Sequence, residues 1–462
     1  MTGWLPELFY DDGRFVSATA LLAGDDGSID QLTSAPEAKG SLIHLNGRAL
    51  LPGMVNAHSH AFQRVIRART EHRTQQSADS FWTWRELMYS AATRLSPEDV
   101  YDASRMAFLE MALSGITAVG EFHYLHHAPD GTPYDDSNLL AKQVVRAAGD
   151  VGIRIALLRV AYARSGFQLE PNPRQARFIE SDPELYLERF TNLRSDLVDT
   201  GGLAWTGIAP HSIRAVPLDY LKRIVRFSNE HETPIHMHVA EQPADVSTCI
   251  EEYGRSPVAL LKTEGLLSER FTGVHTIHIT AKAARMLAEA RANVCACPTT
   301  ERNLGDGIVP ADLFLQHGID VSLGTDSNVQ IDLLEDAREL EYHLRLQKLS
   351  RVLLVHPAAD GQSALANRLF ACATINGAKS IGATTGSLEA GRPADFFTVD
   401  LSDPSIAGLT EANLLSGIVF SLSRTAVRDV VVGGKRIVED GRHPGQDEIV
   451  ERFKALQKRL WD

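Results

Sequence analysis

Cysteine is scarce in this 462-residue chain, which contains only four: Cys249, Cys295, Cys297 and Cys372. They form no Cys-x-x-Cys motif and no regular spacing. A disulfide framework would need such a spacing, so the sequence argues against a small secreted, disulfide-stapled fold. We therefore expect a protein of the reducing cytoplasm.

Long apolar runs and an excess of positive charge are also missing. No apolar run is long enough to cross a bilayer, and the first residues, 1–7, have neither the basic nor the apolar part of a signal peptide. The net charge of −13 argues against nonspecific binding to nucleic acid or to an anionic membrane. It does not exclude a small anionic substrate, because local charge decides that. We expect a small molecule as the partner.

The two ends of the chain show the pattern of short strands. In residues 1–50, apolar runs alternate with turn residues such as Asp11-Asp12-Gly13 and Asn46-Gly47, which is a hairpin signal. The pattern returns in residues 386–445, where Gly433-Gly434 separates two apolar runs. We predict that these two segments form one small composite β-sandwich domain, and that residues 446–462 form a terminal helix.

Residues 51–385 instead repeat a helix followed by a strand. Residues 100–114 have helical periodicity, Gly115 is placed as a helix C-cap, and residues 116–122 are extended. The same cycle recurs several times along the segment. Such repetition predicts a parallel sheet, and this many units favours a closed (β/α)₈ barrel. The predicted fold class is therefore α/β.

Histidines and carboxylates stand at the predicted strand ends, where a barrel of this kind places its catalytic groups. His58 and His60 are two residues apart on a strand and so point to the same face. Taken alone, they could equally be surface or capping histidines. Later strand ends add further candidates, namely His236, His238, Glu241, His275, His278 and Asp326. Imidazoles with a carboxylate suit a hydrolytic zinc site, although iron and manganese accept the same ligands.

This ordered series resembles the amidohydrolase superfamily, whose pattern is His-x-His on strand 1, His on strands 5 and 6, and Asp on strand 8. In its mononuclear deaminase branch a Glu follows the strand-5 histidine by three residues, as Glu241 follows His238. The resemblance thus favours His238 over His236, and His275 over His278. It implies one zinc ion per chain and roles in catalysis for Glu241, His275 and Asp326. The implied metal ligands are His58, His60, His238 and Asp326.

Several further stretches resemble the members of that branch that hydrolyse N-formimino-L-glutamate to N-formyl-L-glutamate and ammonia in histidine degradation. These stretches are residues 58–64, 81–89, 121–127, 210–214 and 297–307. The resemblance implies a homodimer and a set of substrate-binding side chains, since guanidinium matches the geometry of the two substrate carboxylates. Arg302 departs from the pattern, which has a small residue there. The implied substrate-binding residues are Gln63, Tyr124, His211, Arg214 and, as a weaker candidate, Arg85.

Other interpretations stay open at this point. A related deaminase could act on guanine, cytosine or a similar ring, and a metal-free relative could serve as a non-catalytic scaffold. A dinuclear hydrolase would need a bridging lysine on a central barrel strand, and we find none. Arg214 could form a surface ion pair, and Tyr124 could be a packed aromatic. The cluster His123, His126 and His127 indicates loop or packing histidines more than a second metal site.

Overall fold

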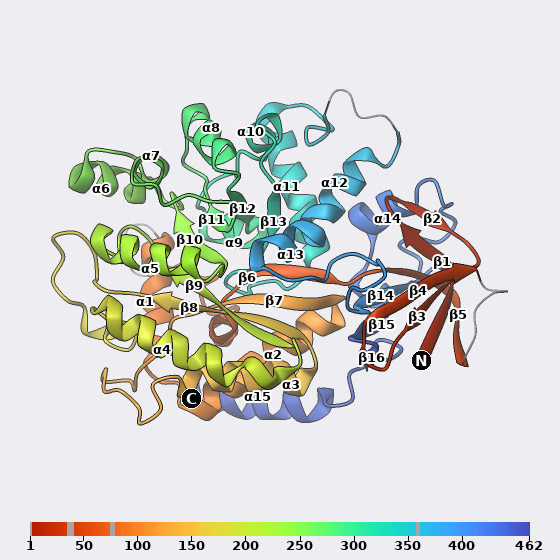
Figure 1. Ribbon diagram of the computed structural model, residues 1–462, viewed down its shortest axis with the longest axis horizontal. Coiled ribbons are helices and arrows are strands. Elements are labelled where there is room, and N and C mark those ends of the chain that lie inside the picture. Colours follow the sequence, from red (N-terminus) through yellow and green to blue (C-terminus); the bar gives the residue numbers. More distant parts are fainter. Residues whose placement is uncertain (1, 35–40, 74–78, 357–360) are drawn as a thin grey trace.

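Two sheets organise the protein, a barrel of parallel strands and a mixed sheet built from both ends of the chain (Figure 1). The computed structural model describes residues 2–34, 41–73, 79–356 and 361–462. None of the helices in these ranges combines the length and the apolar composition that a membrane span requires.

The barrel has eight strands in chain order, each hydrogen-bonded in parallel to the next. A bridge between Ser59 and Asp326 joins the last strand to the first, so the predicted (β/α)₈ barrel is confirmed. The fourth strand is the one that the sequence pattern did not reveal. The strands are β6 (Met54–Ser59), β7 (Ile116–His123), β8 (Arg154–Ala161), β9 (Ala204–Pro210), β10 (Ile235–Val239), β11 (Phe271–His275), β12 (Asn293–Ala296) and β13 (Val321–Leu323).

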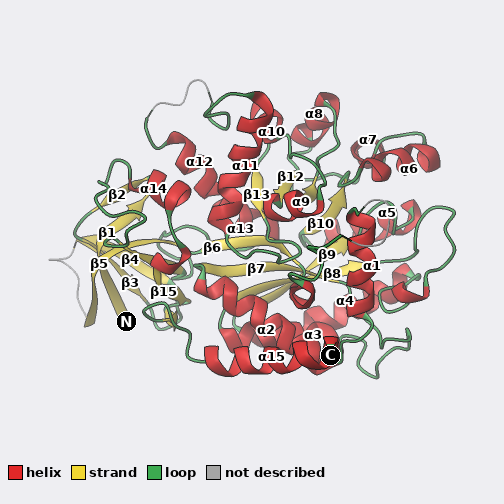
Figure 2. Ribbon diagram, turned by 180° about the vertical axis from the view of Figure 1, so that it is seen from behind, coloured by secondary structure: helices red, strands yellow, loops and turns green. Residues whose placement is uncertain are grey.

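Helices surround the barrel, and α15 packs against α2 on its outside (Figure 2). Gly115, predicted as a helix C-cap, lies one residue beyond the C-cap of α2, which is Ser114. Its φ of 86° is a left-handed conformation that favours glycine. The helices are α1 (Phe81–Ala92), α2 (Pro97–Leu113), α3 (Leu139–Val151), α4 (Pro183–Asp196), α5 (Leu218–Glu230), α6 (Pro243–Tyr253), α7 (Pro257–Thr263), α8 (Ala281–Glu289), α9 (Pro298–Leu304), α10 (Ala311–Gln316), α11 (Leu333–Lys348), α12 (Ala364–Ala373), α13 (Ile375–Ile381), α14 (Leu414–Ser421) and α15 (Gln446–Trp461).

The composite β-domain predicted from the two chain ends is confirmed. The sequence predicted a sandwich. In the structure, hydrogen bonds join all eight strands in one connected sheet, because β5 pairs with β1 on one edge and with β14 on the other. The strands are β1 (Thr2–Asp11), β2 (Arg14–Val16), β3 (Thr19–Ala23), β4 (Ile29–Ser34), β5 (Ser41–Pro52), β14 (Phe396–Asp400), β15 (Val427–Val432) and β16 (Lys435–Val438).

The three predicted turns in this sheet had different outcomes. The turn at Asp11-Asp12-Gly13 connects the antiparallel strands β1 and β2 and is confirmed. Gly433 and Gly434 both have positive φ and connect β15 to β16, so the hairpin predicted there is confirmed. The hairpin predicted at Asn46-Gly47 is wrong, because β5 continues through it and only the register with β1 shifts at that point. The predicted division at residues 50 and 51 also falls inside β5, which leads directly into barrel strand β6.

A buried carboxylate, Asp395, ties the mixed sheet to the barrel. Arg154, at the start of β8, donates to it from Nε at 2.7 Å and from Nη2 at 3.2 Å. Its other donors are the Thr385 hydroxyl at 2.8 Å and the Gly433 backbone N–H at 2.6 Å. The Asp395 carbonyl also accepts from the N–H of Gly53, between β5 and β6, at 3.0 Å. One residue thus holds the junction of the two sheets.

Replacing Asp395 with Ala should lower the free energy of unfolding by roughly 3–5 kcal/mol, because it leaves the Arg154 guanidinium buried without its counter-charge. Urea unfolding followed by circular dichroism measures this change. The control is Asp440→Ala, whose carboxylate is 68% exposed beside Arg428 and should contribute less than about 1 kcal/mol. Equal losses in the two variants would contradict the proposed role of Asp395.

Candidate active site

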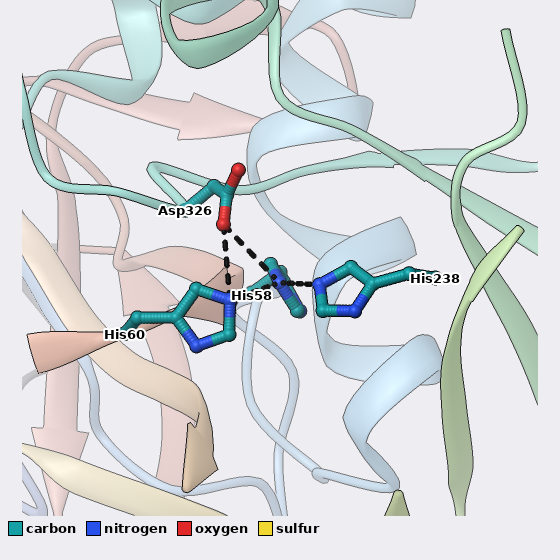
Figure 3. Close-up of side chains that lie close together, drawn as sticks. All are labelled: His58, His60, His238 and Asp326. Carbon is teal, nitrogen blue, oxygen red and sulfur yellow. Dashed lines mark hydrogen bonds and ion pairs between the residues drawn. The ribbon is translucent and has the colours of Figure 1, made fainter. Parts of the chain in front are cut away.

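Four buried side chains converge at the C-terminal mouth of the barrel (Figure 3). His58 lies in β6 and His60 directly follows this strand, His238 lies in β10, and Asp326 follows β13. Nε2 of His58 is 3.2 Å from Nε2 of His60 and 3.2 Å from Nε2 of His238. Oδ1 of Asp326 is 3.1 Å from Nε2 of His60 and 3.4 Å from Nε2 of His58. The implied ligand set therefore meets at one point.

These spacings fit a metal ion. Ligand atoms about 2.0–2.1 Å from a tetrahedral zinc ion lie about 3.3 Å from one another. Nδ1 of His60 lies 2.9 Å from the carbonyl of Phe122, and Nδ1 of His238 lies 3.0 Å from the carbonyl of His211. A carbonyl only accepts, so both Nδ1 atoms carry the proton and both Nε2 atoms present lone pairs. Converging lone pairs in a buried site favour a cation between them.

Burial sets the charge of this donor set. It lowers the pKa of His58 to about 3 and the pKa of His238 well below its usual range, so both rings are neutral. Burial would raise the pKa of Asp326, but the imidazoles of His58 and His60 beside its carboxylate outweigh that effect and hold this pKa well below its usual range. The neutral imidazoles of His58 and His238 and the ionised carboxylate of Asp326 are in the forms that bind a metal.

A close approach of two backbones makes this arrangement possible. A Cβ atom on Gly324 would lie 2.7 Å from Cβ of His58 and 2.8 Å from its carbonyl oxygen. Only glycine therefore lets the end of β13 lie against β6, and two residues later the Asp326 backbone hydrogen-bonds that strand.

His236 and His278, the alternatives to His238 and His275, lie away from the candidate metal centre. Nε2 of His236 hydrogen-bonds to the carbonyl of Ser380 in α13 at 2.8 Å. Nε2 of His278 hydrogen-bonds to the carbonyl of Asp306 at 2.9 Å. Both rings are thus occupied by backbone partners, while His238 and His275 face the site.

His275 lies between three carboxylates. Its Nε2 is 3.7 Å from Oε1 of Glu241 and 3.8 Å from Oδ2 of Asp326. On the opposite side of the ring, Nδ1 is 3.1 Å from Oε1 of Glu301. Burial alone would lower the pKa of His275. The negative charges around the ring outweigh burial and raise this pKa well above its usual range. Burial also raises the pKa of Glu241 to about 7. The pair can therefore hold and pass a proton near neutral pH.

Sequence reasoning assigned no role to Glu301, although it lies in the stretch 297–307. This buried carboxylate also accepts the backbone N–H of Cys297 at 2.8 Å, and the two bonds fix its position behind His275. His275, Cys297 and Glu301 form a second group with metal-ligand spacing. In this group the histidine and the carboxylate already bind each other, and burial raises the pKa of the Cys297 thiol well above its usual range. A carboxylate in the first turn of α9, the helix that follows barrel strand β12, is the signal that could have revealed Glu301.

Two arginines, Arg85 and Arg214, line a cavity together with three of the candidate metal ligands. Arg85, in α1, stacks over Trp82 with its guanidinium carbon 4.4 Å from the ring centre, and its buried Nε and Nη1 have no partner among the described residues. Arg214 donates from Nη1 to Asp245 at 2.7 Å, while its Nε has no partner in the described part of the chain. The cavity is lined by His60, Gln63, Phe81, Trp84, Arg85, Met88, Tyr89, Tyr124, Tyr162, His211, Arg214, His238, Glu241, Leu304 and Asp326.

The remaining predicted substrate-binding residues also line this cavity. Gln63 donates from Nε2 to the Tyr124 hydroxyl at 2.8 Å, and its buried Oε1 has no partner among the residues that the structure describes. The backbone of His211 holds Nδ1 of His238, while its own Nδ1 meets the Ser212 hydroxyl at 3.1 Å. Gln63, Tyr124 and His211 thus share the lining of one cavity with three of the candidate metal ligands and the two arginines.

The residues left open by the sequence lie outside this cavity. Nη1 of Arg302 lies 2.7 Å from Oε1 of Glu339 in α11. Its Nη2 donates to Oε1 of Gln330 at 2.9 Å. His126 and His127 hydrogen-bond through Nε2 to the carbonyls of Val160 and Ile179. Neither these two histidines nor His123 belongs to a group with metal-ligand spacing among the described residues. They are packing histidines at the end of β7 and in the segment that follows it.

Comparison with known proteins shows the family to which the chain belongs. The model of the Amidohydrolase family matches residues 49–437. A formimidoylglutamate deiminase from Pseudomonas aeruginosa is 38% identical over 462 residues, covering 99% of this chain and 98% of that protein. The crystal structure of an amidohydrolase from Brucella melitensis has a TM-score of 0.92 and 33% identity, and the match covers 100% of both chains.

A more distant structure shares the fold. The crystal structure of an adenosine deaminase from Xanthomonas campestris, with bound zinc, has a TM-score of 0.82 at 22% identity and covers 99% of this chain and 98% of that one. The family model spans most of the chain, and the relative from Pseudomonas aeruginosa is similar over nearly its whole length. This protein therefore belongs to the amidohydrolase family.

Proposed function

We propose that this protein is a zinc-dependent hydrolase that converts N-formimino-L-glutamate and water into N-formyl-L-glutamate and ammonia, a step of histidine degradation. The observation that carries the proposal is the cavity itself, whose lining brings together Glu241, three of the candidate metal ligands and two arginines, with His275 beside Glu241. A linear amidine with two carboxylates matches that arrangement. The name of the 38% identical relative, formimidoylglutamate deiminase, supports the same substrate.

We propose one zinc ion per chain, held by His58, His60, His238 and Asp326. Three imidazoles and one carboxylate suit zinc, and the adenosine deaminase of the same fold has zinc bound. The ion would supply a water nucleophile at neutral pH, since zinc lowers the pKa of bound water from about 16 to roughly 7.

The protein's own groups move the protons. Asp326 accepts a proton from the attacking water, and Glu241 delivers protons to the imino nitrogen. Water adds across the C=N bond, the C–N bond then breaks, and the carbon keeps the oxygen as a carbonyl while nitrogen leaves as ammonia. Because burial raises the pKa of Glu241 to about 7, this carboxyl can both take up and release a proton. His275 stabilises the developing charge, with its ring oriented by the hydrogen bond to Glu301.

The two guanidiniums bind the substrate carboxylates. Arg214 has one carboxylate partner, Asp245, while Arg85 has none among the residues described by the structure. A cavity lined by both needs further negative charge, which a dicarboxylate supplies and guanine or cytosine does not. A dinuclear centre is also disfavoured, since barrel strands β6–β13, all of which the structure describes, contain no lysine.

We also propose that the protein works in the cytoplasm. All four cysteines are unpaired and buried, which supports the reducing cytoplasm. The homodimer implied by the family resemblance remains a prediction.

The purified protein should release ammonia from N-formimino-L-glutamate and contain about one zinc ion per chain. Removal of the metal with a chelator should abolish turnover, and added zinc should restore it. Ammonia release and metal content are measured on the same sample. Bound zinc without turnover, together with deamination of guanine or cytosine, would contradict the substrate. Absence of both metal and turnover after reconstitution would favour the scaffold.

Glu241→Gln should lower kcat by about 10²–10⁴, because the variant cannot carry the proton to the leaving nitrogen. Its zinc content and its KM should change little, since Glu241 is not a proposed ligand. Steady-state kinetics and metal analysis measure both effects. Glu289→Gln, which removes a carboxylate that is 63% exposed, is the control and should behave like the unchanged protein. Near-normal turnover of Glu241→Gln would refute the proton-transfer role.

Arg85→Met and Arg214→Met should each raise KM for N-formimino-L-glutamate by roughly 10–100-fold, the effect of losing a hydrogen-bonded charge pair with the substrate. The control is Arg302→Met, since Arg302 points away from the cavity. Equal activity on N-formimino-glycine, which has a single carboxylate, would show that the arginines do not select a dicarboxylate.

A further inference from the structure

We infer that Tyr89 and Tyr162 form part of the subsite that binds a substrate carboxylate, and that Gln175 turns one hydroxyl proton of this pair toward the substrate. The inference rests on the proposed function, because it assigns the carboxylate of that substrate as the acceptor. The sequence alone assigned no role to either tyrosine or to the glutamine, although Tyr89 lies in the stretch 81–89.

The two tyrosines occupy the cavity wall beside the arginines. Tyr89 is one helical turn after Arg85 in α1, so the two side chains lie on the same face of the helix. The guanidinium carbon of Arg85 lies 5.4 Å from the centre of the Tyr89 ring. Tyr162 directly follows β8, and both tyrosines line the cavity together with Arg85 and Arg214. Their hydroxyls thus belong to the positive side of the substrate cavity.

Gln175 fixes the direction of hydrogen bonding in this pair. It lies in the short helix η3 (Pro173–Gln175) and is buried. Its Nε2 donates to the Tyr89 hydroxyl at 2.7 Å and to the Tyr162 hydroxyl at 2.7 Å. Both phenolic oxygens are therefore acceptors toward Gln175. Each hydroxyl still has one proton, which must be donated elsewhere.

Tyr89 and Tyr162 together have two hydroxyl protons to donate. The two hydroxyls also interact with each other, and that contact uses at most one of the two O–H protons. Neither hydroxyl has a further acceptor among the described residues. One proton therefore remains, and the cavity is where an acceptor for it can enter. A substrate carboxylate is such an acceptor.

The orientation of the Gln175 amide follows from the same count. Its two N–H groups match two hydroxyl acceptors, and only Oε1 is left buried without a partner in the described part of the chain. A reversed amide would receive both hydroxyl protons on Oε1 and leave two buried N–H groups unpaired, which is the less favourable arrangement. In the reversed form the tyrosines would offer no proton to the substrate.

The surroundings select a carboxylate. The hydroxyl proton and the free edges of two guanidiniums are all donors, and a carboxylate has about four lone-pair sites for them. A carboxamide would instead bring its own N–H groups against these donors. We therefore expect the subsite to discriminate between an acid and its amide, because a mismatched donor leaves buried groups unpaired.

The test is the affinity of the zinc-loaded protein for N-formyl-L-glutamate, measured by calorimetry. Tyr89→Phe/Tyr162→Phe should bind it roughly 10–100-fold more weakly, with unchanged zinc content, and should raise KM more than it lowers kcat. Gln175→Glu should weaken binding by at least about tenfold, because a carboxylate at this position accepts both hydroxyl protons. Gln175→Met removes the amide that orients the two hydroxyls but adds no acceptor for their protons. This variant should therefore weaken binding less than Gln175→Glu.

Gln143→Glu, which makes the same substitution on the outer helix α3, is the control and should bind like the unchanged protein. Full affinity in Gln175→Glu or in the double Phe variant would overturn the inference, and so would a failure of the unchanged protein to bind the dicarboxylate. If Gln175→Glu does not fold, the double Phe variant decides. Binding that depends on the tyrosines, without turnover of N-formimino-L-glutamate by the unchanged protein, would refute the proposed function and leave this inference standing.

Discussion

Closure of the barrel between β13 and β6 is the interaction on which the site depends. The N–H of Asp326 donates to the carbonyl of His58 at 3.0 Å, and the N–H of His60 donates to the carbonyl of Asp326 at 2.9 Å. The backbone bonds that join the last strand to the first thus carry three of the four candidate ligands to one place. Since Gly324 alone permits this approach, the fold and the candidate metal centre depend on the same contact.

The charges of the cavity are ordered around that centre. Three carboxylates, Asp326, Glu241 and Glu301, surround His275, whereas Arg85 and Arg214 have a single carboxylate partner, Asp245, among the described residues. Under the proposed function, the amidine meets the groups that accept and donate protons, and the carboxylates meet the guanidiniums.

The sequence predicted the repeated units better than the contacts between them. Periodicity revealed seven of the eight barrel strands, and it missed β9 because Gly207 and Pro210 interrupt a short apolar run. Alternation alone left His236 and His238 equivalent, since both point to one face. The structure separates them: His236, nearer the start of β10, reaches Ser380 of α13. The partners of His275 and Arg214, Glu301 and Asp245, lie on other elements, and no local pattern links them.

The site lies where regular structure ends, and this explains the limit of prediction from periodicity. Ala240, His275 and Asp326 all have positive φ, between 46° and 65°, at the ends of β10, β11 and β13. Such a conformation costs a non-glycine residue of order 1–3 kcal/mol and persists only when its surroundings hold it. Here the N–H of His278 binds the carbonyl of Ala240, and β6 binds the backbone of Asp326. A left-handed residue redirects the side chains that follow, so strand alternation stops being a guide at the residues that carry the chemistry.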